Sequence, residues 1–323
     1  MIKFRSSQFI AILLGLFLQV TLAQAQLART HVSSENGNDA NDCARLTPCR
    51  TFQAAHDKTL PAGEITVLDP GGYGAVTITK TISIINDGVG EAGLLVSGGL
   101  GGITINAGAS DAVSLRGLTV KGIGFGGGNG VVFNSGKSLT IENCAIRNLD
   151  GTFPLGRGIA FVPTVSSSLA VSNTVIADNS FAGIDVRPSG TTLAVRATLN
   201  RVEFYGNGFA GFNGTGSGTT GGTIDATVVD SVSARANNFG FRLELFPGQT
   251  VGRLSIVRSV SANNGTGIVA TGANATVRVG QSTVAGNTSG WTTTQGGILQ
   301  SYGDNNVDGN AGDEGAMPVI AKK

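Results

Sequence analysis

One pattern recurs six times along this chain and constrains its fold more than any other feature. Two apolar residues lie two positions apart, a polar residue occupies the fifth position, and an asparagine and a glycine follow, as in the segment that begins Leu139-x-Ile141-x-Asn143. Successive fifth positions are separated by 30, 28, 29, 28 and 23 residues. They are Asn143, Asn173, Arg201, Asp230, Arg258 and Gln281.

A repeat of this length is typical of stacked-repeat proteins. Apolar residues alternate with a period of two inside each unit, which indicates short strands, and no unit has the apolar spacing of an amphipathic helix. Glycine supplies 50 of the 323 residues, roughly twice its usual share, which suits frequent turns. We therefore predict an all-β chain folded as a parallel β-helix, a solenoid of about 8 to 10 coils.

The segment before the repeats has a different character and is expected to cap the solenoid. Thr51 is placed to cap a short helix, and we expect Phe52, Ala55 and Leu60 to cover the apolar end of the stack. The predicted organisation is a cap with the first coils at 26–90, the β-helix at 91–310 and a flexible tail at 311–323.

The repeats, together with the Val32-Ser33 segment and the Gly72-Tyr73 turn of the cap, resemble the right-handed parallel β-helix proteins of the pectate lyase superfamily. The resemblance covers nearly all of the chain after its first 25 residues. It implies a right-handed β-helix. It is far less informative about activity, because one fold supports many functions.

Residues 1–25 have the features of a secretory signal peptide: Lys3 and Arg5, an apolar stretch over 9–22, and small residues before a cleavage site after Ala25. The rest of the chain carries 20 basic and 21 acidic residues, which disfavours nucleic acid as a partner, and no segment is apolar enough to span a membrane. We expect a secreted or periplasmic protein.

The three cysteines are assigned from this expected location and from the repeat. Cys43 and Cys49 are expected to form a disulfide, as is common in exported proteins. Cys144 occupies a position where other coils have Ser or Thr, so it is interpreted as a small buried residue. His31 and His56, the two histidines, lie in the cap and are interpreted as structural.

Equivalent residues of stacked coils form columns along the solenoid. Three columns are interpreted as structural: an asparagine ladder, a phenylalanine stack, and an ion-pair ladder. The predicted members are Asn179, Asn207, Asn238, Asn263 and Asn287 for the first, Phe181, Phe209 and Phe239 for the second, and Arg201, Asp230 and Arg258 for the third.

The richest outward-facing polar patch lies on the strand that follows the repeated glycine. Its members are Asp185, Arg187, Asn213, Arg242 and Glu244, which we predict as a substrate-binding site. Asp185 and Glu244 are expected roughly 12 Å apart, which is too wide for the paired carboxylates of a glycosidase. The motifs that carry catalysis in pectinases and lyases of this fold are absent, so the catalytic residues are unknown.

A possible calcium site is the only cofactor signal. Asp304, Asn306 and Asp308 match the first half of an EF-hand loop, but the twelfth position is Gly315 and the acid lies one residue earlier, at Glu314. A turn rich in Asn and Gly explains the same residues.

Three functions remain open. The favoured prediction is an exported protein that binds a polysaccharide or a cell-surface glycan along its elongated face. The alternatives are a polysaccharide lyase with catalytic residues in loops such as 150–157 or 213–222, and a structural or adhesin-like surface protein.

Overall fold

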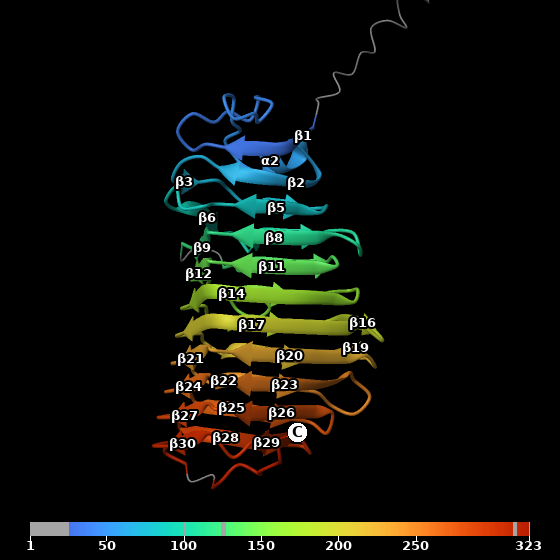
Figure 1. The fold of residues 1–323 in the computed structure, drawn as a ribbon, viewed down its shortest axis with the longest axis vertical. Helices are drawn as coiled ribbons and strands as arrows, with labels where there is room; N and C mark the ends of the chain where they lie inside the picture. Colours follow the sequence, from blue (N-terminus) through green and yellow to red (C-terminus); the bar gives the residue numbers. More distant parts are fainter. Residues whose placement is uncertain (1–25, 100, 124–126, 313–314, 323) are drawn as a thin grey trace, which may run out of the picture.

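The computed structural model describes residues 26–99, 101–123, 127–312 and 315–322. The chain winds into one stack of coils, with its N-terminal cap at one end and its last coil at the other (Figure 1). All pairings between strands of successive coils are parallel. Within these residues, no helix is long and apolar enough to cross a membrane.

Three faces make up the wall of the solenoid. The first and second faces meet in one 19-stranded sheet, and the third face is a separate sheet of nine strands. The first face contains β1 (Leu27–Val32), β2 (Thr59–Val67), β5 (Ile82–Ile85), β8 (Ala112–Arg116), β11 (Ser138–Glu142), β14 (Ser167–Ala177), β17 (Ala194–Tyr205), β20 (Thr223–Val229), β23 (Val251–Val257), β26 (Ala275–Gly280) and β29 (Ile298–Ser301).

The long strands β14 and β17 turn the corner and continue on the second face. The other strands of the second face are β3 (Gly71–Gly72), β6 (Ala92–Val96), β9 (Leu118–Gly122), β12 (Ala145–Arg147), β21 (Val232–Ala234), β24 (Val260–Ala262), β27 (Thr283–Ala285) and β30 (Asn306–Asp308).

The third face has one strand in each of nine successive coils. These are β4 (Val76–Ile78), β7 (Gly101–Asn106), β10 (Asn129–Ser135), β13 (Ile159–Phe161), β15 (Ala182–Val186), β18 (Ala210–Thr215), β22 (Phe239–Glu244), β25 (Thr266–Thr271) and β28 (Ser289–Thr294). A small extra sheet joins β16 (Ser189–Thr191) to β19 (Gly218–Thr220).

The corner between the first and second faces explains the fifth position of the repeat. All six residues at this position have a positive φ, between 45° and 53°. This left-handed conformation turns the chain within a single residue and is tolerated best by Asn and Asp among non-glycine residues. Arg258 occupies it as well, and its guanidinium bonds Asp230 of the preceding coil at 2.8 and 3.0 Å. Arg201 bonds Asn173 instead, so the predicted ion-pair ladder contains one pair.

Buried asparagines close the corner between the second and third faces. The Nδ2 of Asn179 donates to the Oδ1 of Asn207 at 2.9 Å, and Asn207 donates in turn to the carbonyl of Ile176 at 3.0 Å. The prediction of an asparagine ladder is confirmed, but two members were wrong: Asn238 and Asn263 are exposed. The column contains Asn179, Asn207, Ala236, Asn264, Asn287 and Asn310.

A column of glycines runs along the third face, and four of them, Gly158, Gly183, Gly240 and Gly267, lie against these asparagines. A Cβ on Gly183 would lie 2.7 Å from the carbonyl oxygen of Gly211 in the next coil and 3.1 Å from the amide nitrogen of Asn207. The requirement for glycine is therefore steric, because the space of the missing side chain is filled by the neighbouring coil. The column is Gly102, Gly130, Gly158, Gly183, Gly211, Gly240, Gly267 and Gly290.

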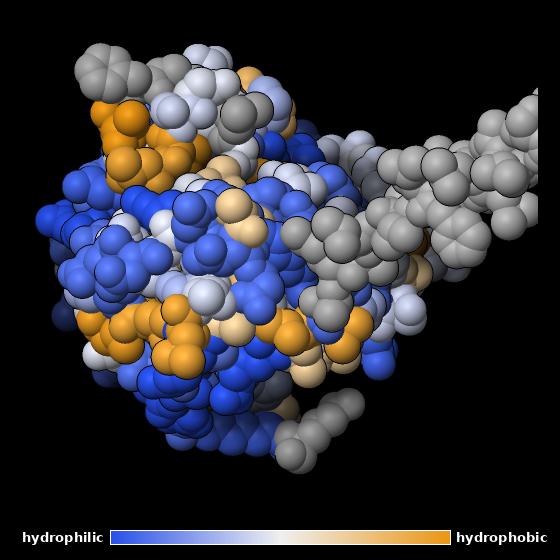
Figure 2. Space-filling view, turned by 90° about the horizontal axis from the view of Figure 1, so that it is seen from above, coloured by the Kyte–Doolittle hydropathy of each residue, from blue (hydrophilic) through white to orange (hydrophobic). Residues whose placement is uncertain are grey.

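The cap covers the first coil, as predicted. Helix α2 (Phe52–Lys58) begins at Thr51, whose hydroxyl accepts a hydrogen bond from the Ala54 amide, and Phe52 and Ala55 are fully buried. Leu60 is exposed, so its predicted place over the core was wrong. Seen from this end, the molecule presents mainly hydrophilic side chains (Figure 2).

Cys43 and Cys49 form the predicted disulfide, with their Cα atoms 4.7 Å apart. The loop that they close pairs with the outer edge of β1: the amide of His31 donates to Cys43, and the amide of Cys49 donates to His31. An open strand edge is a site of aggregation. The disulfide thus holds a loop that covers such an edge.

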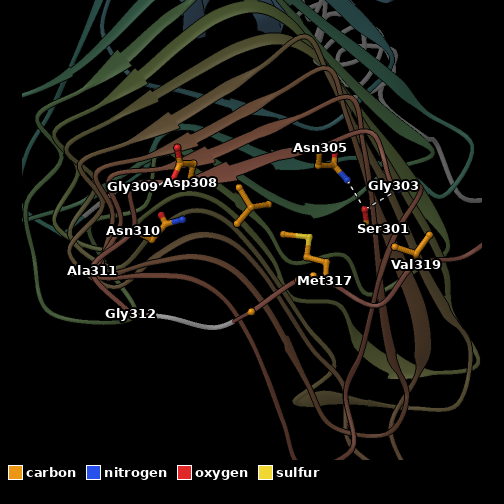
Figure 3. Close-up of a pocket in the computed structure, with 13 residues that line it drawn as sticks. Ser301, Gly303, Asn305, Asp308, Gly309, Asn310, Ala311, Gly312, Met317 and Val319 are labelled. Atoms are coloured by element: carbon orange, nitrogen blue, oxygen red, sulfur yellow. Dashed lines mark hydrogen bonds between the residues drawn. The ribbon is translucent and has the colours of Figure 1, made fainter.

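The last coil is partly covered by the C-terminal segment, which the sequence had suggested as a flexible tail. The amide of Ser301 donates to the carbonyl of Pro318, the amide of Ile320 donates to the carbonyl of Ser301, and Met317 is buried against the core. A cavity of about 660 Å³ lies between this segment and the last coil (Figure 3). Asp308 is the one ionisable residue among the described residues that line it.

We predict that Gly183→Ala lowers the free energy of unfolding by about 2–3 kcal/mol, because the added methyl group must displace backbone of the next coil. Urea denaturation followed by circular dichroism measures this change. Gly72→Ala is the matched control, since a Cβ there meets only one atom, at 4.0 Å, and a change within about 0.5 kcal/mol is expected. Equal stability of the two variants would contradict the steric role of the column.

Candidate functional site

The third face carries the polar patch that the sequence predicted, in the predicted register. Asp185 on β15 pairs with Asn213 on β18, and Asn213 pairs with Arg242 on β22. Glu244 ends β22, two residues after Arg242, and Arg187 follows the end of β15, two residues after Asp185. Five side chains from three coils are thereby aligned along the long axis of the solenoid.

These side chains form one continuous chain of hydrogen bonds. Asn213 donates to Asp185 at 2.7 Å and accepts from Arg242 at 3.0 Å, and Arg242 also bonds Glu244. Arg187 donates to Asp185 at 3.3 Å and to the hydroxyl of Ser217 at 2.7 Å. Each carboxylate is therefore held by at least one guanidinium group.

Arg157, which the repeat does not predict as a site residue, completes the chain of hydrogen bonds. Its guanidinium donates to Asp185 at 3.0 Å and to the carbonyl of Pro154, and its side chain is 8% exposed. Arg157 ends the loop 150–157, which the sequence had singled out for its one acid, one base and one aromatic residue. The spacing of the repeat does not extend to this loop, so its contact with β15 was not predictable.

Burial divides the predicted site into an inner and an outer part. Asp185 and Asn213 are completely buried, so they support the site from below and are not available to contact a polymer. The side chains of Arg187 and Glu244 are 25% and 22% exposed, and that of Arg242 is 13% exposed. Direct contact with a ligand is thus restricted to the outer side chains.

Phenylalanines flank this polar chain. Phe181 and Phe209 stack face to face at 4.6 Å, which confirms the predicted packing role. Phe239 was wrongly placed in the same column: it lies one residue further along and meets Phe209 edge-on, at 5.3 Å. Phe153 from the loop extends the row at 5.1 Å from Phe181, and it is half exposed.

Arginines lie over these rings. The guanidinium of Arg187 lies 5.1 Å from the centre of the Phe153 ring, and that of Arg242 lies 5.5 and 5.3 Å from the Phe209 and Phe239 rings. Such cation–π contacts hold a guanidinium group in place without neutralising its charge. We name Phe153, Arg187, Arg242 and Glu244 the aromatic-arginine rim.

The electrostatics of the site are dominated by arginine. Three guanidinium groups (Arg157, Arg187 and Arg242) face two carboxylates, which leaves one excess positive charge. Burial lowers the pKa of Arg242 from its usual value, and the charge of Glu244 opposes this shift. The buried Nε of Arg242 has no hydrogen-bond partner in the described part of the chain.

Two of the three predicted calcium ligands, Asp304 and Asp308, bond other groups of the protein. Asp304 bonds Lys322 at 2.6 Å and the amide of Gln281 at 3.0 Å, and Asp308 accepts from the amide of Gly309. Asn306 is exposed on β30, and Glu314 lies outside the described residues. Within residues 26–99, 101–123, 127–312 and 315–322, no three His, Cys, Asp or Glu side chains cluster as metal ligands would.

Cys144 and the histidines lie apart from this site. Burial raises the pKa of the Cys144 thiol to about 11, which keeps it protonated and unreactive. Both histidines are buried in the cap, and this burial lowers their pKa values. His56 contacts Asp57 and accepts a hydrogen bond from the amide of Thr79, which fits a structural role.

No protein-family model matches the sequence, and no curated protein is detectably similar to it. Several solved structures have a similar fold, and two of them are a pectate lyase and a lacto-N-biosidase. A pectate lyase, Pel9A, superposes with a TM-score of 0.56 at 18% identity, over 92% of this chain and 82% of its own. The GH136 lacto-N-biosidase from Eubacterium ramulus superposes with a TM-score of 0.52 at 12% identity, over 91% of this chain and 67% of its own.

The chain has the fold of a pectate-lyase-like β-helix. The predicted right-handed parallel β-helix is therefore confirmed. At these identities the likeness concerns the fold alone, and the pectate-lyase-like fold does not by itself define what the third face does.

We predict that Asp185→Ala lowers the free energy of unfolding by about 3–5 kcal/mol, because it leaves Arg157 buried without a counter-ion. The matched control is Asp225→Ala, which removes a pair with Arg253 whose side chains are 40% and 62% exposed. That exposed pair is expected to contribute less than about 1 kcal/mol. Urea denaturation of both variants measures their free energies of unfolding. If Asp185→Ala also lowered this free energy by less than about 1 kcal/mol, the pair between Arg157 and Asp185 would not be needed for stability.

Proposed function

We propose that this protein binds a polysaccharide along its third face, at the aromatic-arginine rim. The observation that carries the proposal is the exposed ring of Phe153 beside the part-exposed guanidinium of Arg187, supported from below by buried ion pairs. A sugar can pack its apolar C–H face on an aromatic ring while its polar groups bond charged side chains. An elongated ligand suits a site that extends along several coils.

Hydroxyl groups and charge at the rim support a glycan ligand. The exposed hydroxyl of Ser217 accepts a hydrogen bond from Arg187, and the part-exposed carboxylate of Glu244 lies on the same face. The excess positive charge favours an anionic polysaccharide. The pectate lyase and the lacto-N-biosidase that have a similar fold are, by their names, enzymes that act on carbohydrates.

Binding accounts for this arrangement better than hydrolysis does. A glycosidase needs one carboxyl group that holds a proton and a second that attacks or activates water. Asp185 is completely buried between two arginines and an asparagine, and Glu244 is bonded to Arg242. Neither carboxylate is free to act on a sugar.

Retention on a uronic-acid polymer tests the proposal. Purified protein, residues 26–323, should be retained on immobilised polygalacturonate, and Phe153→Ala or Arg187→Ala should weaken binding about tenfold at a temperature where each variant is still folded by its melting curve. Leu95→Ala, which truncates an exposed apolar side chain on the second face, is the control and should bind normally. Undiminished binding by both rim variants would refute the site, and no retention of the unmodified protein would favour a structural or adhesive role.

A polysaccharide lyase is the second candidate, and Arg242 is the observation that favours it. Burial lowers its pKa, which is the direction that accepting a proton would require, and its part-exposed side chain reaches the rim. We expect a lyase to release 4,5-unsaturated products from uronic-acid polymers, which absorb ultraviolet light. The assay is run with and without calcium, because a calcium site at Asp304, Asn306 and Asp308 stays a proposal. No rise in ultraviolet absorbance under either condition would exclude these polymers as lyase substrates.

We also propose that the protein is exported. The disulfide between Cys43 and Cys49 supports an oxidising location. The signal peptide predicted for residues 1–25 lies outside the described residues. Mass spectrometry of the protein from its native cells, fractionated into cytoplasm, periplasm and medium, would locate it and test cleavage after Ala25.

A further inference from the structure

A second polar pocket lies on the first face, at the C-terminal end of the solenoid and away from the aromatic-arginine rim. It has a volume of about 780 Å³. Its walls come from three successive coils and from the chain segment 320–322, which forms one side. The residues that shape its chemistry are Arg278, Gln281, Gln300, Tyr302, Asp304 and Lys322.

Arg278 supplies a positive charge that no carboxylate neutralises among the described residues. It lies on β26 between Ser255 and Gln300 of the neighbouring coils. Its Nε donates to the Oε1 of Gln300 at 3.1 Å, which fixes the guanidinium group, while its two terminal amino groups make no hydrogen bond to any described residue. Two parallel donors of this kind fit a carboxylate.

Tyr302 and its apolar neighbours give the pocket an apolar surface beside the charge of Arg278. A Cβ on Gly280 would lie 3.0 Å from the Tyr302 ring, so the glycine allows the ring to lie close against β26. Val257 and Ile320 add apolar surface. The pocket therefore combines an aromatic surface with a fixed guanidinium group and the side-chain amides of Gln281 and Gln300.

A salt bridge holds the side of the pocket that the C-terminal segment forms. Lys322 bonds Asp304 at 2.6 Å, and Asp304 also accepts a hydrogen bond from the amide of Gln281 at 3.0 Å. The hydrogen bond from Lys322 lowers the pKa of the Asp304 carboxyl. Because Asp304 bonds Lys322 and the backbone of Gln281, it does not compete with a ligand for Arg278.

We propose that this pocket binds a small hydroxylated carboxylate of the sugar-acid class. The carboxylate of the ligand pairs with the terminal amino groups of Arg278, its hydroxyls bond the amides of Gln281 and Gln300, and its C–H face packs on Tyr302. This site is independent of the proposed polysaccharide site, because the two lie on different faces and share no residue.

Isothermal titration calorimetry with D-glucuronate and D-glucose tests the inference, since the two probes differ only in the carboxylate. Glucuronate should bind at least tenfold more tightly than glucose. Arg278→Gln should weaken glucuronate binding about tenfold. Gln300→Glu should abolish it, because the new carboxylate occupies Arg278 and repels the ligand, while this ion pair preserves the fold.

Arg253→Gln is the matched control, since Arg253 lies on the same face but does not line the pocket, and it should bind glucuronate normally. Melting temperatures of all variants establish that they are folded. No binding of glucuronate to the unmodified protein, or equal binding to Gln300→Glu, would overturn the proposal. The rim variants Phe153→Ala and Arg187→Ala should bind glucuronate as the unmodified protein does. Loss of glucuronate binding at Arg278 can therefore be told apart from loss of polysaccharide binding at the third face.

Discussion

The contact between each buried asparagine and a glycine of the preceding coil sets the geometry on which the other features depend. The amide nitrogen of Asn207 occupies the space that a side chain at Gly183 would fill, and the same contact recurs at Gly240 and Gly267. The asparagine satisfies backbone groups that a tight corner would otherwise leave buried without partners. In the four coils where the two residues meet, at Gly158, Gly183, Gly240 and Gly267, the contact limits how far one coil lies from the next.

That fixed spacing determines what the third face can carry. Side chains in register on successive strands are close enough for direct hydrogen bonds, so Asp185, Asn213 and Arg242 form one hydrogen-bonded chain. Burying charges in such a chain is unfavourable unless every charge is paired. The buried pairs hold the outer arginines rigidly, and a rigid outer surface reduces the entropy that binding a polymer would cost.

The columns of stacked residues show which positions the repeat predicts correctly and which it does not. The repeat placed Asp185, Asn213 and Arg242 correctly, because strand alternation has a strict period of two. The same repeat placed Asn263 and Phe239 one residue away from their true columns. The turns between strands differ in length by a residue, and a similar residue stands next to the correct position, as Asn263 does beside Asn264. Arg157 and Phe153 were missed because a loop follows no period, and only its packing brings it to β15.

The sequence by itself determined the β-helix and the register of the polar patch on the third face. These features follow from local conformational preference and from alternation, which act within a few residues. Only the tertiary structure decided that Asp185 is buried rather than available, that Arg157 is its partner, and that the segment 320–322 forms a pocket with Arg278. Those outcomes depend on contacts between residues distant along the chain, which no local pattern encodes.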